Sequence, residues 1–330
     1  MMQATLTWQQ ELAQAIQDPA QLLNELGLEE HLLSGAIAAA KLFPLRVPQA
    51  FIARMRKGDV RDPLLAQVLP LDIEQHMVEG YNNNPLQEAN YNPIAGLLHK
   101  YKNRVLLTVT GSCAINCRFC FRRSFPYEKN NPGKTGWQDV IDYIAADKSI
   151  DEVIFSGGDP LNASDKSLLW LSEKLAEIPH LQRLRIHTRL PVVIPARITD
   201  ELLAWLTGTR LQPIVILHVN HAQELDSTAQ NALQRLAEKS VTLLSQSVLL
   251  RGINDTASVL IHLSKRLFAC RVLPYYLHVL DKTQGTAHFD VPLSVAKELH
   301  KEMAKQLSGY LVPRLVQEVA GMPSKVVVGN

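Results

Sequence analysis

The sequence predicts an α/β fold in the form of a partial (β/α)6 barrel with an N-terminal helical region. From Arg104 onward, short β-branched runs alternate with amphipathic helical segments. After the first unit, a new strand begins every roughly thirty residues, which is the length of a strand–helix–strand step. Six consecutive units favour a parallel sheet with outer helices, but they are too few for a complete closed barrel. A doubly wound open sheet is the alternative.

The first part of the chain, 1–100, is predicted to consist of helices and connectors. Apolar residues recur at helical spacing within 8–16 and 22–26. A further helical stretch covers 31–42, and another begins at Pro48, a residue that fits the start of a helix. No internal repeat is present, so this region is expected to be a helical preface to the barrel.

Six strand–helix units are expected in 101–310, and 311–330 forms a separate C-terminal segment. The strands are predicted at 104–110, 152–157, 184–189, 214–220, 241–250 and 271–280. Helices follow them at 136–148, 168–178, 199–206, 228–239, 256–269 and 295–307. In such a sheet the loops at the carboxyl ends of the strands carry the chemistry.

Composition excludes several classes of protein. Among 330 residues, 46% are hydrophobic and 20% charged, which is ordinary for a globular protein. The net charge of +2 gives no support for a nucleic acid partner. No apolar run approaches the roughly 18 residues of a membrane span, and the N-terminus lacks the pattern of a signal peptide. A cytoplasmic protein with no membrane partner is therefore expected.

Three of the four cysteines form a CxxxCxxC run directly after the first strand. Cys113, Cys117 and Cys120 supply soft thiolate ligands. Three local ligands would leave one iron of a four-iron cluster open to a non-protein ligand. A structural zinc site is the alternative, but it usually needs a fourth protein ligand, and no histidine lies close by. The distant Cys270 is expected to be a buried small residue.

Basic residues follow the cysteine run closely. Arg118, Arg122 and Arg123 would favour the thiolate forms and offset the charge of a cluster.

These residues resemble the radical S-adenosylmethionine (SAM) superfamily. The CxxxCxxC run has an aromatic residue before its last cysteine, and SGGDP follows the second strand. The resemblance implies a [4Fe-4S] cluster on the three cysteines and a contact of the glycine-rich segment with SAM. The SAM-binding residues so implied are Ser156, Gly157, Gly158 and Asp159, with Gln246 as a further contact.

Several segments, in order along 95–325, are similar to the lysine 2,3-aminomutase family. They include CRFCFRRSF, SGGDPL, RLRIHTRLPVVIPARIT and LHVLDKTQGTAHF. The LHKYKNRVLL and YLVP segments look like the bacterial branch that serves elongation factor P. That resemblance implies conversion of L-lysine to (R)-β-lysine by a radical 1,2-amino shift. It also implies a functional link to the ligase that attaches β-lysine to the factor, and a reductant such as flavodoxin or ferredoxin.

The family resemblance also implies pyridoxal 5'-phosphate (PLP), which requires a Schiff-base lysine. Lys325 in AGMPSKVVVG matches that position, and the apolar residues after it favour docking over a solvated tail. Arg104 matches a family position near the cofactor and suits a phosphate. Tyr101 is its weaker companion.

An amino acid substrate needs a cation for its carboxylate, and the resemblance assigns this role to Arg122. For the distal ammonium of lysine it assigns Asp281, together with Glu318 at a position where relatives carry an aspartate. Two acidic residues favour a cationic substrate over glutamate. The five histidines at or beside strand ends receive no catalytic role.

Other functions remain open at this stage. The chain could be a metabolic lysine or glutamate aminomutase, or a radical enzyme without a PLP step. From a different class, it could be a zinc-stabilised binding protein.

Overall fold

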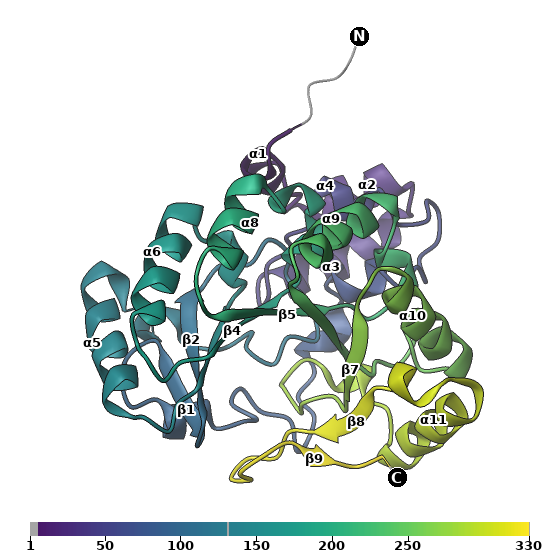
Figure 1. The fold of residues 1–330 in the computed structure, drawn as a ribbon. Helices are drawn as coiled ribbons and strands as arrows, with labels where there is room; N and C mark the ends of the chain where they lie inside the picture. The colour runs from purple at the N-terminus through teal and green to yellow at the C-terminus, as the bar shows by residue number, and fades with distance from the viewer. Residues whose placement is uncertain (1–5, 131, 330) are drawn as a thin grey trace.

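The computed structural model describes residues 6–130 and 132–329, and it forms one curved sheet flanked by helices (Figure 1). The strands follow one another across the sheet in chain order, from β1 to β9. A doubly wound sheet reverses its order at a switch point, so that alternative is wrong. The expected lack of a signal peptide concerns in part residues 1–5, which lie outside the described residues.

Strands β2 to β8 are parallel, and β1 and β9 pair antiparallel at the two edges. The strands are β1 Leu97–Tyr101, β2 Arg104–Thr110, β3 Glu152–Gly157, β4 Arg183–Thr188, β5 Gln212–His218, β6 Thr242–Val248, β7 Leu273–His278, β8 Arg314–Gln317 and β9 Val326–Val327. The six predicted strands correspond to β2 to β7, and the partial barrel with six strand–helix units is confirmed.

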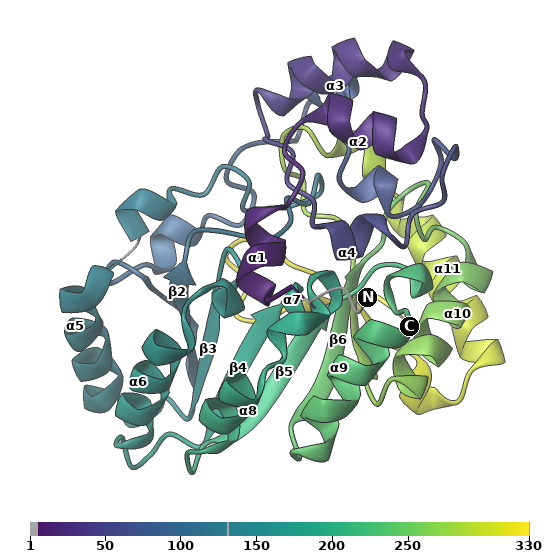
Figure 2. The ribbon, with the colours of Figure 1, turned by 90° about the horizontal axis from the view of Figure 1, so that it is seen from above.

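The outer helices follow the parallel strands and lie along an arc on one side of the sheet (Figure 2). They are α5 Gly133–Ala146, α6 Asp165–Ala176, α8 Asp200–Thr207, α9 Ser227–Glu238, α10 Ala257–Ala269 and α11 Leu293–Gln306. The short α7 Leu190–Val193 lies in the loop after β4. Thr199, Asp226 and Thr256 accept hydrogen bonds from backbone N–H groups in the first turns of α8, α9 and α10.

The N-terminal region packs against the loops at the carboxyl ends of the strands. Its helices are α1 Trp8–Ala13, α2 Pro19–Leu26, α3 Leu33–Ala40 and α4 Gln49–Ile52. Arg54 donates to the backbone oxygens of Val192 at 2.5 Å and Glu224 at 2.9 Å, which belong to the loops after β4 and β5. The helical preface therefore covers the end of the barrel where chemistry is expected.

Three edge elements differ from the sequence prediction. Strand β1 lies at the end of the stretch expected to be helices and connectors, and β8 and β9 lie in the C-terminal segment. The helix predicted from Pro48 is only the single turn α4. Strands β1 and β9 are short edge strands, which neighbouring strands stabilise more than their own composition does.

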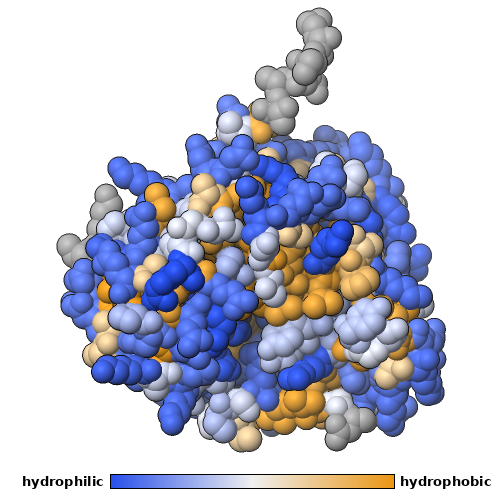
Figure 3. Space-filling model, in the orientation of Figure 1, coloured by the Kyte–Doolittle hydropathy of each residue, from blue (hydrophilic) through white to orange (hydrophobic). Residues whose placement is uncertain are grey.

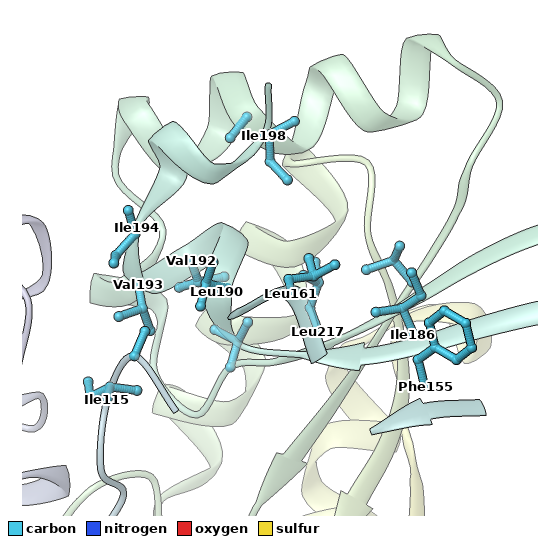
Figure 4. Close-up of a cluster of buried hydrophobic side chains, with 14 of the residues drawn as sticks. Ile115, Phe155, Leu161, Ile186, Leu190, Val192, Val193, Ile194, Ile198 and Leu217 are labelled. Atoms are coloured by element: carbon cyan, nitrogen blue, oxygen red, sulfur yellow. The ribbon is translucent and has the colours of Figure 1, made fainter. Parts of the chain in front are cut away.

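Buried apolar side chains from both regions form one core. Trp8 and Phe51 of the N-terminal helices belong to the same cluster as Phe155 and Ile186 of the sheet. Figure 4 shows part of it, with Leu190, Val192, Val193 and Ile194 around α7. On the face in Figure 3, apolar residues gather near the centre, and mainly hydrophilic residues surround them. Within 6–130 and 132–329, no helix has the length and apolar character that crossing a membrane requires.

Candidate active site

A cavity of about 630 Å³ lies at the carboxyl ends of the parallel strands. Strand ends, the cysteine loop and the C-terminal hairpin β8–β9 all contribute to its wall. It brings together all the residues that the sequence analysis selected, namely Tyr101, Arg104, Cys113, Cys117, Cys120, Arg122, Ser156, Gly157, Gly158, Asp159, Gln246, Asp281, Glu318 and Lys325. The volume is that of a pocket for small molecules rather than for a macromolecule.

The three thiols of the cysteine loop line one part of this cavity. Burial raises the pKa of the Cys113 thiol, and it raises that of Cys120 to about 11. The Nη1 of Arg189 donates a hydrogen bond to the Sγ of Cys117 at 2.8 Å. The protein thus supplies soft donors in a desolvated site, which suits ligands for iron. Cys270 lies apart, buried at the end of α10, as expected.

Two of the arginines that follow the cysteines act on a thiol as expected. The charges of Arg122 and Arg123 work to lower the pKa of Cys120, although burial outweighs them. Arg118 and Arg123 both form ion pairs with Glu74, at 2.6 Å and 3.2 Å. Glu74 belongs to the turn Asp72–Gln75 and is buried, and its single carboxylate is the counter-ion that both cations share. The guanidinium that contacts a cysteine sulfur is instead that of Arg189, which follows β4.

The donor set of the cavity fits an iron–sulfur cluster. Each of three thiols on its wall can bind a different iron, and thiolate sulfur is the ligand that such clusters use. In the part of the chain that the structure describes, no three His, Cys, Asp or Glu side chains converge on a point that could hold a single metal ion.

The glycine pair after β3 permits a close approach of two loops. Gly158 donates its N–H to the backbone oxygen of Thr110 at 2.8 Å. A Cβ at Gly157 would lie 2.4 Å from that same oxygen, and one at Gly158 would lie 2.5 Å from the oxygen of Ser112. Since real Cβ atoms do not come so close, only glycine allows the loop after β3 to lie against the cysteine loop.

The carboxylate of Asp159 accepts hydrogen bonds from the protein itself. It accepts from the Thr188 hydroxyl at 2.7 Å and from the backbone N–H groups of Leu161, Arg189 and Leu190. These bonds tie the loop after β3 to the loop after β4. The side chain predicted to contact SAM is thus committed to positioning Arg189.

Arg122 is buried and held from one side by Glu88. The Nε and Nη2 of Arg122 donate to the two carboxylate oxygens of Glu88, at 2.9 Å and 2.6 Å. Nη1 donates to the hydroxyl of Ser156 at 3.1 Å. Burial works to lower the pKa of Arg122, but the charge of Glu88 outweighs it and raises that pKa. The outer edge of the guanidinium, between Nη1 and Nη2, keeps N–H groups for another carboxylate.

Lys325 reaches the cavity because Val326 and Val327, directly after it, pair as β9 with β8. Its ammonium forms an ion pair with Glu318, which also binds Lys100 at 2.5 Å and the hydroxyl of Tyr101 at 3.0 Å. Burial works to raise the pKa of Glu318, but Lys325 and Lys100 hold it at about 2. Glu318 therefore stays ionised over the whole physiological range.

Asp281 is a second carboxylate of the same cavity. Burial, followed by the charge of Glu318, raises the pKa of Asp281 to about 7. Within the described chain its carboxylate has no hydrogen-bond or ion-pair partner. A cation that enters the cavity would favour the ionised form and find this carboxylate available.

Aromatic and cationic side chains stand beside these carboxylates. The Arg104 guanidinium lies 3.9 Å from the centre of the Tyr101 ring and donates to Asn103 at 3.0 Å. Tyr275 donates its hydroxyl to that of Tyr276 at 2.8 Å.

Three histidines and Gln246 form a neutral polar wall between the cysteines and Lys325. Burial lowers the pKa of His187, and it lowers those of His218 and His278 to about 4 and about 3. The Nε2 of His218 lies 2.6 Å from the Nε2 of Gln246, and the Nε2 of His187 is buried with no hydrogen-bond partner among the described residues. An unpaired buried nitrogen in a cavity can serve a bound molecule.

Sequence reasoning missed five charged residues of the cavity wall, which are Glu88, Lys100, Arg185, Arg189 and Arg314. Arg189 is the last residue of the predicted strand 184–189, and this position at a strand end was the signal that could have identified it. Glu88 precedes the sheet in a turn, Glu88–Tyr91, that no pattern marks.

Comparisons with known proteins agree with this geometry. A family model described as the Radical SAM superfamily matches residues 107–257. An L-lysine 2,3-aminomutase from Haemophilus influenzae is 52% identical over 320 residues, which cover 97% of this chain and 95% of that protein. The enzyme of the same name from Escherichia coli is 51% identical over 96% of this chain and 93% of its own length. One from Buchnera aphidicola is 46% identical over 97% and 95%.

Proposed function

The chain belongs to the lysine 2,3-aminomutase family of the radical SAM superfamily, and on that premise we propose that it converts L-lysine to β-lysine. One observation carries the proposal: a single cavity holds three soft thiols at one part and an amine with two carboxylates at another. A radical reaction requires that its source and its substrate share one enclosure from which water is excluded.

The residues present fit the three cofactors of such an enzyme. Cys113, Cys117 and Cys120 would hold a [4Fe-4S] cluster, and the loop 156–159 with Gln246 would hold SAM. PLP would bind to Lys325, with Arg104 and Tyr101 for its phosphate side. When bound, the cluster and SAM supply the radical, and PLP supplies the conjugated ring to which the migrating nitrogen is attached.

Arg122 would bind the carboxylate of the substrate end-on. Glu88 and Ser156 hold the guanidinium from its other edges, so it is oriented before the substrate arrives. A bidentate pair of this type fixes both the position and the plane of the carboxylate.

Asp281 and Glu318 would bind the distal ammonium of lysine. Both carboxylates line the cavity, and Glu318 is close enough to raise the pKa of Asp281. A glutamate side chain would instead place a third carboxylate between them, which is unfavourable in a buried site. This charge pattern favours lysine as the substrate.

Glu318 would also become available to the substrate when PLP is attached to Lys325. In the structure Lys325 is an ion-pair partner of Glu318, and in that state it is not a nucleophile. A substrate ammonium bound between Asp281 and Glu318 replaces this partner. The neutral histidines nearby add no charge that would compete.

The finer assignments follow from the resemblance to the elongation factor P branch. The product would be (R)-β-lysine, which a separate ligase would attach to that factor. A flavodoxin or ferredoxin would supply electrons. All four cysteines are free, which agrees with a cytoplasmic location, where thiols remain reduced.

The test is anaerobic reconstitution with iron and sulfide, followed by SAM, PLP, dithionite and either L-lysine or L-glutamate. Chiral chromatography should detect (R)-β-lysine and no β-glutamate. Formation of β-glutamate would reject the role of Asp281 and Glu318. Zinc in place of iron in protein purified without oxygen would reject the proposal as a whole.

A further inference from the structure

Arg189 is a buried cation that neither the sequence motifs nor the proposed chemistry has used. It follows β4, and its side chain reaches across the barrel end to the cysteine loop. Its Nη1 lies 2.8 Å from the Sγ of Cys117. Among the described residues, this is the arginine that donates a hydrogen bond to a cysteine sulfur.

A network from three separate segments holds this guanidinium in place. Its Nη2 donates to Gln67 at 2.6 Å and to Glu224 at 2.9 Å. Gln67 is fully buried in the N-terminal region, and it also donates to Glu224 at 3.1 Å. The rings of Phe51 and Phe119 lie 5.2 Å and 5.9 Å from the guanidinium carbon. Water is therefore replaced by fixed partners on several sides.

Glu224 offsets the charge of Arg189 but does not turn it away from the sulfur. Its carboxylate is fully buried and also accepts the N–H groups of Asn220 and His221, at 2.9 Å and 3.0 Å. These donors draw negative charge away from the ion pair. The positive edge of the pair thus faces Cys117, and in a desolvated site this orientation acts strongly on nearby charge.

We propose that Arg189 is a positioning residue that raises the reduction potential of a cluster bound to Cys113, Cys117 and Cys120. This inference rests on the proposed function for the presence of the cluster. Reduction adds one electron from an external donor, dithionite in the test, and no bond breaks. An N–H···S bond from a cation to a ligand sulfur stabilises the added negative charge, and such bonds tune cluster potentials.

The inference also assigns a role to the N-terminal region. Gln67 orients Nη2 of Arg189, and the backbone oxygen of Gln67 accepts the N–H of Arg118, next to Cys117, at 3.0 Å. The helical preface thus fixes the cysteine loop and the arginine relative to each other. Without it the N–H···S bond would not keep its geometry.

The test measures the midpoint potential of the reconstituted full-length protein by redox titration with electron paramagnetic resonance. Arg189→Gln should lower the ratio of reduced to oxidised cluster at least tenfold at a given solution potential, which is about 59 mV for one electron. Arg189→Lys keeps the positive charge but loses the planar set of N–H donors of a guanidinium. The midpoint potential of this variant should therefore lie between those of the wild type and Arg189→Gln.

Arg197→Gln is the matched control. Arg197 is also fully buried, pairs with Asp165 at 2.8 Å and donates to the oxygen of Leu161 at 2.7 Å. It contacts no cysteine. This variant should lose thermal stability as Arg189→Gln does, yet it should retain the wild-type potential.

An unchanged potential in Arg189→Gln, with the same iron content as the wild type, would overturn the proposal. Should that variant fail to hold a cluster, Gln67→Leu decides, because it leaves Arg189 in place and removes the side-chain hydrogen bonds of Gln67, including the acceptor that orients the guanidinium. A lowered potential there supports the proposal, and a wild-type potential rejects it. The titration needs neither lysine nor PLP, so a wrong substrate leaves it valid. A wild-type protein without any cluster would instead contradict the proposed function.

Discussion

Asp281 should make lysine binding depend on pH. Its pKa in the free protein is about 7, because burial and then Glu318 disfavour the charged form. A bound ammonium favours the ionised form, so binding below pH 7 must release a proton, and affinity must fall as the pH falls. At about pH 6 roughly a tenth of Asp281 is ionised, so the dissociation constant should rise about tenfold, or about 1.4 kcal/mol.

Calorimetry of the PLP-loaded protein with lysine, in buffers of different ionisation enthalpy, measures the dissociation constant and the number of protons released on binding. The wild type should release close to one proton at about pH 6 and almost none above pH 8. Asp281→Asn should bind more weakly above pH 8 and lose the proton release, because Glu318, with its pKa of about 2, does not titrate there. Asp290→Asn is the control, since Asp290 accepts from Tyr81 instead. Equal proton release in wild type and Asp281→Asn would refute the reasoning.

Three further predictions concern the other parts of the site. Borohydride reduction of the PLP-loaded protein should leave a pyridoxyl group on Lys325, which peptide mass spectra would detect, and a label on another residue would contradict this assignment. Lys325→Ala should abolish turnover while the iron content stays constant. Arg122→Lys should raise KM for lysine about tenfold or more, because the bidentate pair is lost; an unchanged KM would reject this role. Gly158→Ala should cost about 2 kcal/mol of unfolding free energy and reduce iron loading, because the new Cβ would meet the backbone of Ser112. The control Gly309→Ala has open space around its Cβ and should change neither quantity. Equal effects of the two variants would disprove the close-approach argument.

The sequence was most informative where local pattern and tertiary structure agree. Strands β2 and β3 have the predicted bounds, because they lie inside the sheet, contain β-branched residues and are followed by amphipathic helices. The edge strands β1 and β9 were missed, and so was β8 beside β9. Each is short, and β1 and β9 obtain their hydrogen bonds from antiparallel partners that no local pattern shows.

For the site, motifs identified side chains but not their partners. The resemblance selected Arg122 and Glu318, yet Glu88 and Lys100 come from segments 34 and 218 residues away in the chain. Of the three arginines near the cysteines, Arg122 and Arg123 act on Cys120 through their charge, but the arginine that donates a hydrogen bond to a cysteine sulfur is the distant Arg189. Such pairs depend on the loops that the barrel brings together, and spacing in the sequence does not encode them.

The central claim is that this cavity moves the α-amino group of lysine to the β-carbon. The most direct test uses L-lysine with heavy nitrogen at its α-carbon, given to the reconstituted protein with SAM, PLP and dithionite. The account predicts β-lysine that carries the heavy nitrogen on its β-carbon, as nuclear magnetic resonance would detect. Cleavage of SAM together with recovery of lysine whose heavy nitrogen remains on the α-carbon would contradict it.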